Sequence, residues 1–341
     1  MKMLKVAFVC FILIFQVATA EEDYNIDYED LSDLKGSQAG DRYHEDKNEY
    51  PAEKYLAKGK AARRTNYQDS CSTCGIAYGN GEEEGRVING RPVRPMYKYP
   101  WIVSLIKGTR IICGGALVSA NFVMTAGHCV FDRKKVDLPQ CNGRIVDRYC
   151  YVDPSQLKVG FLTSSQRTPS ESVAILRIIP HPRYSYSVQV HDVSLLRLAK
   201  TIQCSHTLMP VCLPQRDFLN LGTRLITAGY GWNTPDGIAG PQILREGVVS
   251  VIDPRRCARR HQPIETINNL VCAAGMESGQ SSCYGDSGSA LIGRVGPKFY
   301  AVGVVSYGSF PRCSALNPVA YTKVANVMPF ISRVVMDLPM N

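Results

Sequence analysis

What the chain lacks removes several classes of protein. After its first 20 residues, the 341-residue sequence has no apolar stretch long enough to cross a bilayer. It has no internal repeat, no Asn-x-Ser/Thr glycosylation acceptor and no acidic cluster typical of a calcium loop. No nucleic-acid motif is present, and the longest basic run is Arg133–Lys135. We therefore expect no metal, no cofactor, no nucleic-acid partner and no membrane attachment.

The first 20 residues form the one strongly apolar segment. Lys2 and Lys5 give it a positive start, residues 6–17 are almost all apolar, and residues 18–20 are the small residues Ala-Thr-Ala. The apolar run is short for a membrane anchor. The sequence therefore predicts a signal peptide over residues 1–20 and a secreted, extracellular protein.

Cysteine is abundant. Cys10 lies in the predicted signal peptide, so 12 of the 13 cysteines remain in the exported chain. An even number of cysteines in an exported protein is typical of disulfides, and here it predicts six. The alternative is zinc, for which only the pair Cys71 and Cys74 has suitable spacing. No second pair matches it, and we favour disulfides.

Charge divides the chain into two parts. Residues 21–86 hold 9 Lys or Arg against 16 Asp or Glu, whereas residues 87–341 hold 28 against 14. Residues 21–70 are polar and lack apolar periodicity, which predicts a mostly disordered pro-segment. The basic part could bind an anionic surface, but a solvated basic surface partly neutralised by the acidic leader is the simpler interpretation. We expect a pro-segment over residues 21–86 and one domain over residues 87–341.

From Val87 onward, short apolar runs alternate with Gly, Pro, Asn and Asp. Many short runs of this kind predict an all-β sandwich or barrel. Only the C-terminal tail predicts a helix, because Val327, Phe330, Ile331 and Val334 fall on one helical face. The runs are Trp101–Ile106, Gly115–Val118, Phe122–Ala126, Leu157–Leu162, Val173–Ile179, Val193–Leu198, Leu225–Ala228, Gly247–Ile252, Ala290–Ile292, Phe299–Val305 and Ala320–Val324.

Three motifs could supply the parts of a hydrolytic site. Residues 285–288 read Gly-Asp-Ser-Gly, residues 125–129 read Thr-Ala-Gly-His-Cys, and residues 191–196 begin with His-Asp before an apolar run. A serine becomes a strong nucleophile when a histidine takes its proton and a buried carboxylate orients that histidine. Each motif alone is weak, because such serines, histidines and aspartates more often serve turns or cores.

Together, in the order His, Asp, Ser, these motifs make the chain resemble the chymotrypsin-like (trypsin-fold) serine proteases. The resemblance runs in register across residues 87–341 and does not cover residues 21–70. It implies two six-stranded antiparallel β-barrels with a C-terminal helix and a site between the barrels. The matching stretches are residues 86–90, 99–101, 113–115, 125–129, 192–196, 211–214, 229–232, 282–288, 305–308 and 321–324.

The resemblance also implies roles for single residues. His128 would be the general base, Asp192 the carboxylate that orients it, and Ser287 the nucleophile. The backbone N–H groups of Gly285 and Ser287 would form the oxyanion hole. Ser306 would support Asp192. The strand from Ser306 to Gly308 would pair with the substrate backbone.

The primary specificity pocket is predicted in the same way. Its floor would be Ser281, six positions before the nucleophile, where a trypsin-like enzyme has an aspartate. Gly308 would leave one wall open, and Val319 would shorten the pocket from the position where the family usually has glycine. We therefore expect cleavage after small or medium apolar residues in preference to Phe, Tyr or Trp, and least after Lys or Arg.

The chain departs from the family pattern at three places. Gly127 stands where alanine is usual, and residues 288–290 read Gly-Ser-Ala in place of Gly-Gly-Pro. One common disulfide is absent, since its positions fall near Leu225 and Gly293. None of these changes removes a catalytic group.

Disulfide pairing follows partly from the resemblance. The four bridges that it implies are Cys74–Cys212, Cys113–Cys129, Cys257–Cys272 and Cys283–Cys313. Four cysteines remain, with three possible pairings, and from these we predict Cys141–Cys150 and Cys71–Cys204.

An activating cut is expected between Arg86 and Val87, after the exposed acidic run at residues 82–85. In the family the freed amine pairs with the carboxylate before the nucleophile, here Asp286. The arginine implies a trypsin-like activating protease. Other expected partners are protein or peptide substrates and protein protease inhibitors.

Two alternatives to an active endopeptidase remain. One is a catalytically silent homologue that acts as a binding or cofactor protein, and the other is an unrelated disulfide-rich binding protein. The filled histidine, aspartate and serine positions favour an active enzyme.

Overall fold

The computed structural model describes only part of the chain. The described residues are 71–78, 91–95, 97–143, 146–161, 171–231, 244–258, 264–275, 281–308, 314 and 316–339. The predicted signal peptide, the pro-segment up to residue 70, Arg86, Val87 and Cys313 lie outside them.

The first half of the described chain forms a closed barrel of six antiparallel strands, in the order β2-β3-β4-β7-β6-β5. β-Branched and aromatic residues favour these strands, and alternate positions turn side chains such as Leu105, Leu117 and Val159 into the core. Its strands are β2 (Ile102–Lys107), β3 (Arg110–Leu117), β4 (Phe122–Thr125), β5 (Leu157–Phe161), β6 (Glu171–Pro180) and β7 (Ser194–Leu198).

The second barrel also has six antiparallel strands. Five pairings join β9-β10-β13-β12-β11-β8, and pairing of β8 with β9 closes the ring. A two-residue strand, β1 (Arg91–Pro92), pairs with the start of β9, beyond the part of β9 that pairs with β10. The barrel strands are β8 (Arg224–Gly229), β9 (Arg245–Ile252), β10 (Leu270–Ala274), β11 (Ala290–Val295), β12 (Lys298–Gly308) and β13 (Val319–Lys323). The predicted all-β fold with two six-stranded barrels is confirmed.

The predicted C-terminal helix is α3 (Val324–Val334), which buries Val324, Val327, Phe330 and Ile331. The expectation that only the tail is helical was too narrow. Two short helices, α1 (Gly127–Val130) and α2 (Ile264–Asn268), are also present. Short 3-10 helices are η3 (Arg133–Lys135), η4 (Pro139–Cys141), η5 (Arg148–Cys150), η6 (Pro154–Gln156) and η7 (Pro254–Cys257). None of the helices in the described ranges is both long and apolar enough to cross a bilayer.

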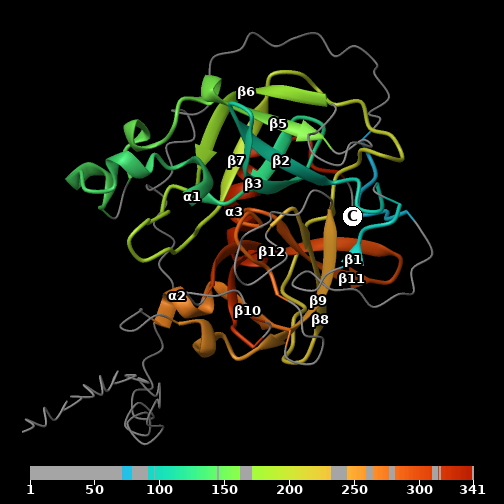
Figure 1. Cartoon of the computed structure of the whole chain (residues 1–341). Coiled ribbons are helices and arrows are strands. Elements are labelled where there is room, and N and C mark those ends of the chain that lie inside the picture. The colour runs from blue at the N-terminus through green and yellow to red at the C-terminus, as the bar shows by residue number, and fades with distance from the viewer. Residues whose placement is uncertain are drawn as a thin grey trace, which may run out of the picture. The chain divides into compact units, whose positions relative to one another are not determined.

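The two barrels lie next to each other (Figure 1), and a few polar contacts join them. The N–H of Gly114 in the first barrel donates to the Ser287 carbonyl oxygen in the second, at 2.8 Å. Conversely, the Thr322 hydroxyl in β13 donates to the Asp192 carbonyl oxygen at 3.0 Å. These contacts fix the relative position of loops that come from different barrels, and the candidate site lies where they meet.

A short segment of the leader, residues 71–78, is tied to the barrels by two disulfides. Five bridges form between described cysteines: Cys71–Cys204, Cys74–Cys212, Cys113–Cys129, Cys141–Cys150 and Cys257–Cys272. These are pairs named from the sequence. Cys283 is also disulfide-bonded, while Cys313, the partner named for it, lies outside the described residues.

Candidate active site

His128 and Asp192 form a buried pair. His128 lies in α1, directly after β4, and Asp192 comes two residues before β7 begins. The strands β4 and β7 pair with each other, so their ends bring the two side chains together. Nδ1 of His128 lies 2.7 Å from Oδ2 of Asp192, and the His128 backbone N–H donates to Oδ1 at 2.8 Å. Two contacts to one carboxylate fix the orientation of the imidazole.

Asp192 stays ionised although it has no exposed surface. Burial alone would raise the pKa of its carboxyl, but the adjacent His128 and hydrogen bonds from His128 and Ser306 hold that pKa below its usual range. The Ser306 hydroxyl, on β12 of the second barrel, donates to Oδ2 at 2.5 Å. Ser306 thus contacts the Asp192 carboxylate from the opposite barrel.

Ser287 lies in the turn before β11, and its carbonyl oxygen accepts the bond from Gly114. The next residue, Gly288, has φ of +80°, and a Cβ there would lie 2.3 Å from the Thr125 hydroxyl oxygen. Only glycine fits this position. The Ser287 and His128 side chains line one cavity, but no hydrogen bond between them is formed among the described contacts. Nε2 of His128 lies 3.8 Å from the Cys129 sulfur.

Asp286, directly before the serine, is completely buried. Its Oδ1 accepts from the Gly231 N–H at 2.7 Å and its Oδ2 from the Cys283 N–H at 2.8 Å. Burial raises the pKa of Asp286 to about 6, against the lowering effect of these two bonds. Within the described ranges no cation pairs with this carboxylate. The site therefore holds a buried carboxylate that a cation would stabilise.

The backbone around Ser287 leaves two donors open. Gly285 has φ of +94°, which favours glycine. Among the described backbone hydrogen bonds, neither the Gly285 N–H nor the Ser287 N–H donates to a carbonyl. Two unpaired N–H groups beside a serine hydroxyl are what an oxyanion needs.

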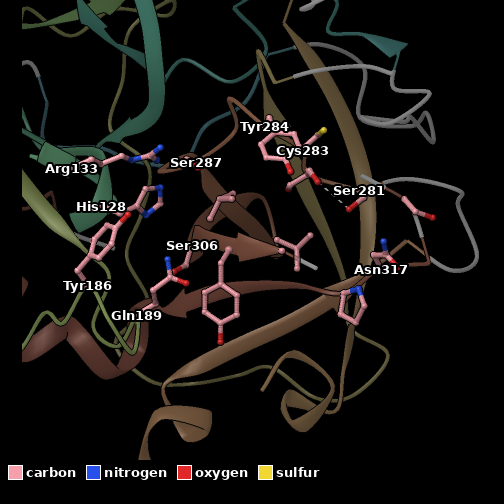
Figure 2. Close-up of a pocket in the computed structure, with 17 residues that line it drawn as sticks. His128, Arg133, Tyr186, Gln189, Ser281, Cys283, Tyr284, Ser287, Ser306 and Asn317 are labelled. Carbon is pink, nitrogen blue, oxygen red and sulfur yellow. Dashed lines mark hydrogen bonds between the residues drawn. The ribbon is translucent and has the colours of Figure 1, made fainter. Parts of the chain in front are cut away.

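One cavity of about 330 Å³ joins the serine to the predicted specificity pocket. Ser281, Gly308 and Val319 all line it together with His128 and Ser287 (Figure 2). Ser281 is buried, and its hydroxyl donates to the Ser282 carbonyl oxygen at 3.1 Å. Val319 pairs with Gly308 across the β12–β13 ladder, and its Cγ2 lies 3.6 Å from where a Gly308 Cβ would be. The valine therefore occupies space beside the wall that Gly308 leaves open.

Several residues of the cleft were missed from the sequence. Arg133, Tyr186 and Gln189 line the His128 end, and Tyr284 lies beside the serine turn. They come from loops whose course no local pattern indicates. Only the basic run at Arg133–Lys135 gave any signal, and it pointed to a solvated surface.

Tyr184 explains why glycine stands at position 127. A Cβ on Gly127 would lie 3.0 Å from Cδ2 of the Tyr184 ring, tighter than ordinary contact. The Tyr184 side chain is completely buried beside Asp192, and its hydroxyl has no partner among the described residues. Burial raises the pKa of this phenol far above its usual range, so it stays neutral. The tyrosine ring thus takes the room that a methyl group would need.

The usual Gly-Pro after the serine motif is Ser289-Ala290 here. Ser289 is buried, and a Cβ on Gly114 would lie 2.0 Å from its hydroxyl oxygen. The extra hydroxyl therefore packs over Gly114, and Ser289 is not one of the residues that line the cavity.

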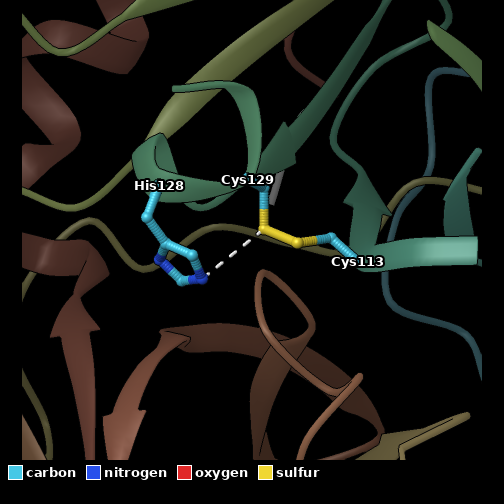
Figure 3. A group of neighbouring side chains, drawn as sticks. All are labelled: Cys113, His128 and Cys129. Atoms are coloured by element: carbon cyan, nitrogen blue, oxygen red, sulfur yellow. Dashed lines mark hydrogen bonds between the residues drawn. A yellow bond between two sulfur atoms is a disulfide. The ribbon is translucent and has the colours of Figure 1, made fainter. Parts of the chain in front are cut away.

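One group of side chains satisfies the distance requirement for a metal site. The ligand atoms of Cys113, His128 and Cys129 lie within 4.8 Å of one another. However, Figure 3 shows the two sulfurs joined in a disulfide, so neither is a thiolate. We assign no metal to this group.

Comparison with known proteins decides the family. The family model described as Trypsin matches residues 87–331, which is well over half of the chain. The chain belongs to the trypsin family. This family membership makes it a serine endopeptidase, a hydrolase of peptide bonds, and agrees with the two barrels and the cleft between them.

Individual members of the trypsin family are similar at a modest level. Transmembrane protease serine 5 of Homo sapiens is 29% identical over 270 residues, covering 78% of this chain and 54% of that protein. Trypsin 5G1 of Aedes aegypti is 31% identical over 253 residues, covering 73% and 85%. The phenoloxidase-activating enzyme of Bombyx mori is 28% identical, covering 79% and 64%. The chain thus spans just over half of the first of these relatives and about two thirds of the third.

Among solved structures, neuropsin, a serine protease expressed in the limbic system of mouse brain, has the same fold. It is 26% identical, with a TM-score of 0.56, and the match covers 73% of this chain and 98% of neuropsin. The matching family model begins at residue 87, so the acidic leader lies outside it.

Proposed function

We propose that the cut chain hydrolyses peptide bonds through an acyl-enzyme formed on Ser287. The observation that carries this proposal is the buried His128–Asp192 pair, held by Ser306 and opening into the same cavity as Ser287. A buried carboxylate on Nδ1 leaves Nε2 free to take a proton, which is the arrangement a serine nucleophile needs.

The steps follow from these positions. Ser287 Oγ attacks the substrate carbonyl carbon while its proton passes to His128 Nε2, and the oxyanion accepts bonds from the Gly285 and Ser287 N–H groups. The C–N bond then breaks, and the leaving amine takes the proton from Nε2. Water then attacks the ester carbonyl carbon while His128 Nε2 takes its proton. The C–O bond to Ser287 breaks, the carboxylic acid product leaves, and Ser287 Oγ takes the proton back from Nε2. The separation of Nε2 from Ser287 must close in the substrate complex, as catalytic hydrogen bonds commonly do.

Active-site titration tests this proposal. After cutting, a serine-directed phosphonate should label one site per chain, and Ser287→Ala should abolish labelling. Asp192→Asn should lower kcat by roughly 10⁴ without loss of folding, because the imidazole would adopt the wrong tautomer. An intact, cut chain that does not label would instead favour a silent homologue that acts by binding.

We further propose that the chain is exported and made as an inactive precursor, activated by cleavage between Arg86 and Val87. The buried Asp286, which pairs with no cation in the part of the chain that the structure describes, supports this, because the freed Val87 amine would supply one. Protein protease inhibitors are expected to bind the same cleft, and a trypsin-like protease is expected to make the cut.

The strand order is consistent with the Val87 amine reaching the Asp286 carboxylate. Arg91 in β1 pairs with Glu246 in β9, and Glu246 pairs on its other side with Ala228 in β8. Two strand spacings amount to about 10 Å. The residue after Ala228, Gly229, lies against Asp286, since a Cβ there would be 2.1 Å from its Oδ1. Four residues from Val87 to Arg91 can span about 14 Å, which is sufficient.

Cleavage after small or medium apolar residues is the specificity that the pocket supports. Ser281 carries no charge to pair with Lys or Arg, and Val319 narrows the space beside Gly308. Burial of a cationic side chain there would leave it unpaired. Profiling of the cut enzyme on a peptide library tests this assignment.

A further inference from the structure

One cation stands at the end of the cleft opposite Ser281. Arg133 lines the same cavity as His128 and Ser287, together with Tyr186 and Gln189 (Figure 2). Figure 2 shows its side chain extending toward the side on which His128 and Ser287 lie. A positive charge is therefore placed beside the atoms that are proposed to react.

Arg133 has no ion-pair or hydrogen-bond partner among the described residues, and it is exposed. The acidic residue nearest to it in sequence is already engaged. The Asp132 carboxylate accepts from the Lys134 N–H at 3.2 Å and lies 3.5 Å from the Lys135 ammonium. That ammonium also donates to the Tyr149 carbonyl oxygen at 2.6 Å and lies over the Tyr149 ring. Of the three consecutive cations, only Arg133 lines the cleft.

The loop that carries Arg133 is held in place from both sides. The Asp132 N–H donates to the Cys150 carbonyl oxygen at 2.8 Å, and Cys150 is bridged to Cys141. Directly before it, the Phe131 ring stacks on Tyr186 with centroids 4.6 Å apart and planes at 18°. The guanidinium therefore projects from a fixed backbone, which lowers the entropy lost when it binds a ligand.

We propose that Arg133 determines specificity by binding a carboxylate of the substrate, on a residue next to the scissile bond and on the far side of His128 from the Ser281 pocket. The assignment rests on the proposed peptidase function. A guanidinium pairs with a carboxylate through two parallel N–H···O bonds, and it repels a substrate cation at the same place. The substrate class is thus a peptide with an apolar residue in the Ser281 pocket and Asp or Glu close beside it.

The test uses the cut, full-length protein and sets of fluorogenic peptides. Each set keeps one apolar residue for the Ser281 pocket and carries Glu, Gln or Lys at a single position, either the residue before the pocket residue or one of the two after the bond. At one of these positions kcat/KM for Glu should exceed that for Gln by roughly fivefold at low salt. The ratio should fall at high salt, because exposed charges are screened.

Variants test whether Arg133 causes the preference for Glu over Gln. Arg133→Gln should bring the Glu/Gln ratio to about 1 and Arg133→Glu should invert it, while Arg133→Lys should keep part of it. Lys134→Gln is the matched control, since Lys134 is an exposed cation in the same turn that does not line the cavity. Its ratio should equal that of the wild type. Phosphonate labelling of Ser287 confirms that every variant is folded.

Two results would overturn the assignment. One is a ratio of kcat/KM for Glu over Gln peptides near 1 in the wild type, and the other is a ratio that Arg133→Gln leaves unchanged. Either would show that Arg133 binds no substrate carboxylate. Failure of the cut wild type to hydrolyse even the neutral Gln peptides is a separate outcome, which would refute the peptidase proposal and this assignment with it.

Discussion

Single side chains limit the size of the substrate residue that the predicted specificity pocket can hold, and Val319 is the clearest case. It stands beside Gly308 where the pocket would otherwise stay open. Val319→Gly should raise kcat/KM for Phe and Tyr substrates relative to Ala and Val substrates by roughly tenfold, since each methylene of fit is worth that order. Val319→Ala should give a smaller shift in the same direction. A wild type that prefers Arg would instead show that Ser281 is not the floor of the pocket.

A second residue-scale feature lies next to Asp192 in the sequence. The rings of His181 and His191 stack with centroids 4.5 Å apart, and His191 Nδ1 is buried without a partner among the described residues. Burial lowers the pKa of His181 to about 3 and of His191 to about 4. Both rings are therefore neutral in the folded state. The backbone of His191 has φ of +48°, which asparagine adopts readily.

Acid should destabilise the barrels through this pair. The unfolded chain takes up protons on both histidines below about pH 6.5, whereas the folded chain does not until about pH 4. Their contribution to stability is therefore complete above pH 6.5 and is lost as the pH falls through that window. His191→Asn should make the loss between pH 6.5 and 4 shallower by at most about 3 kcal/mol. Urea unfolding at pH 7, 5 and 4 measures the free energy of unfolding of both proteins. If the loss with falling pH is the same in His191→Asn as in the wild type, His191 does not contribute to the acid sensitivity.

At this scale the sequence indicated the residues proposed to react more readily than those that surround them. His128, Asp192 and Ser287 could be named because their motifs carry a chemical requirement in a few consecutive residues. Tyr184 and Arg133 could not, since their contacts with the site depend on how two long loops fold. The reason for glycine at position 127 could not be predicted either, because it is the Tyr184 ring that lies against it.

At the scale of elements, the segment at residues 71–78 is attached to the barrels twice. Besides its two disulfides, the Gly75 N–H donates to the Pro210 carbonyl oxygen and the Gly75 carbonyl oxygen accepts from Phe299. Gly75 has φ of +67°, and a Cβ there would lie 2.3 Å from the Phe299 oxygen. The segment is therefore held against the barrels by backbone hydrogen bonds and close packing as well as by its disulfides.

After the activating cut, this segment should stay attached. Non-reducing gels should show one band and reducing gels two. Removal of one bridge, by Cys71→Ser with Cys204→Ser or by Cys74→Ser with Cys212→Ser, should leave one non-reduced band, because the other bridge remains. Removal of both bridges should give two bands without reductant. Release of the leader from the cut wild type under non-reducing conditions would refute the double tether.

Strands were predictable from the sequence to a large extent, and the reason is visible in the two strands that were missed. Each of the eleven apolar runs corresponds to a strand. The two strands missed are β1, with two residues, and β10, whose run Leu-Val-Cys-Ala-Ala is short and weakly β-branched. Barrel closure came from the family resemblance, because the pairing of β8 with β9 joins strands by contacts that no local pattern encodes.

For the whole molecule, the proposed cut should change stability in a pH-dependent way. In the uncut chain the pKa of Asp286 is raised from 3.8 to about 6, so at pH 7 its buried charge costs roughly 3 kcal/mol. Pairing with the Val87 amine removes that cost while the carboxyl is ionised and the amine protonated, between about pH 6 and 8. The cut form should therefore have the higher Tm in this window, and the difference should shrink below pH 5 and above pH 9.

Calorimetry of cut and uncut Ser287→Ala protein measures this difference without self-digestion. Asp286→Asn is the control, since it removes the charge and should remove most of the difference between the two forms. Equal Tm values for cut and uncut protein at every pH would mean that the amine does not pair with Asp286.

The short connection from Val87 to β1 also affects the binding equilibrium of the amine. The Val87 amine can lie at most about 14 Å from Arg91. Its effective concentration at the Asp286 carboxylate is therefore in the millimolar range or above. This value is fixed by the length of the connection and does not fall when the protein is diluted. A free dipeptide that presents the same amine would have to reach a comparable concentration in solution to occupy the site. The cut chain should therefore remain active at any dilution.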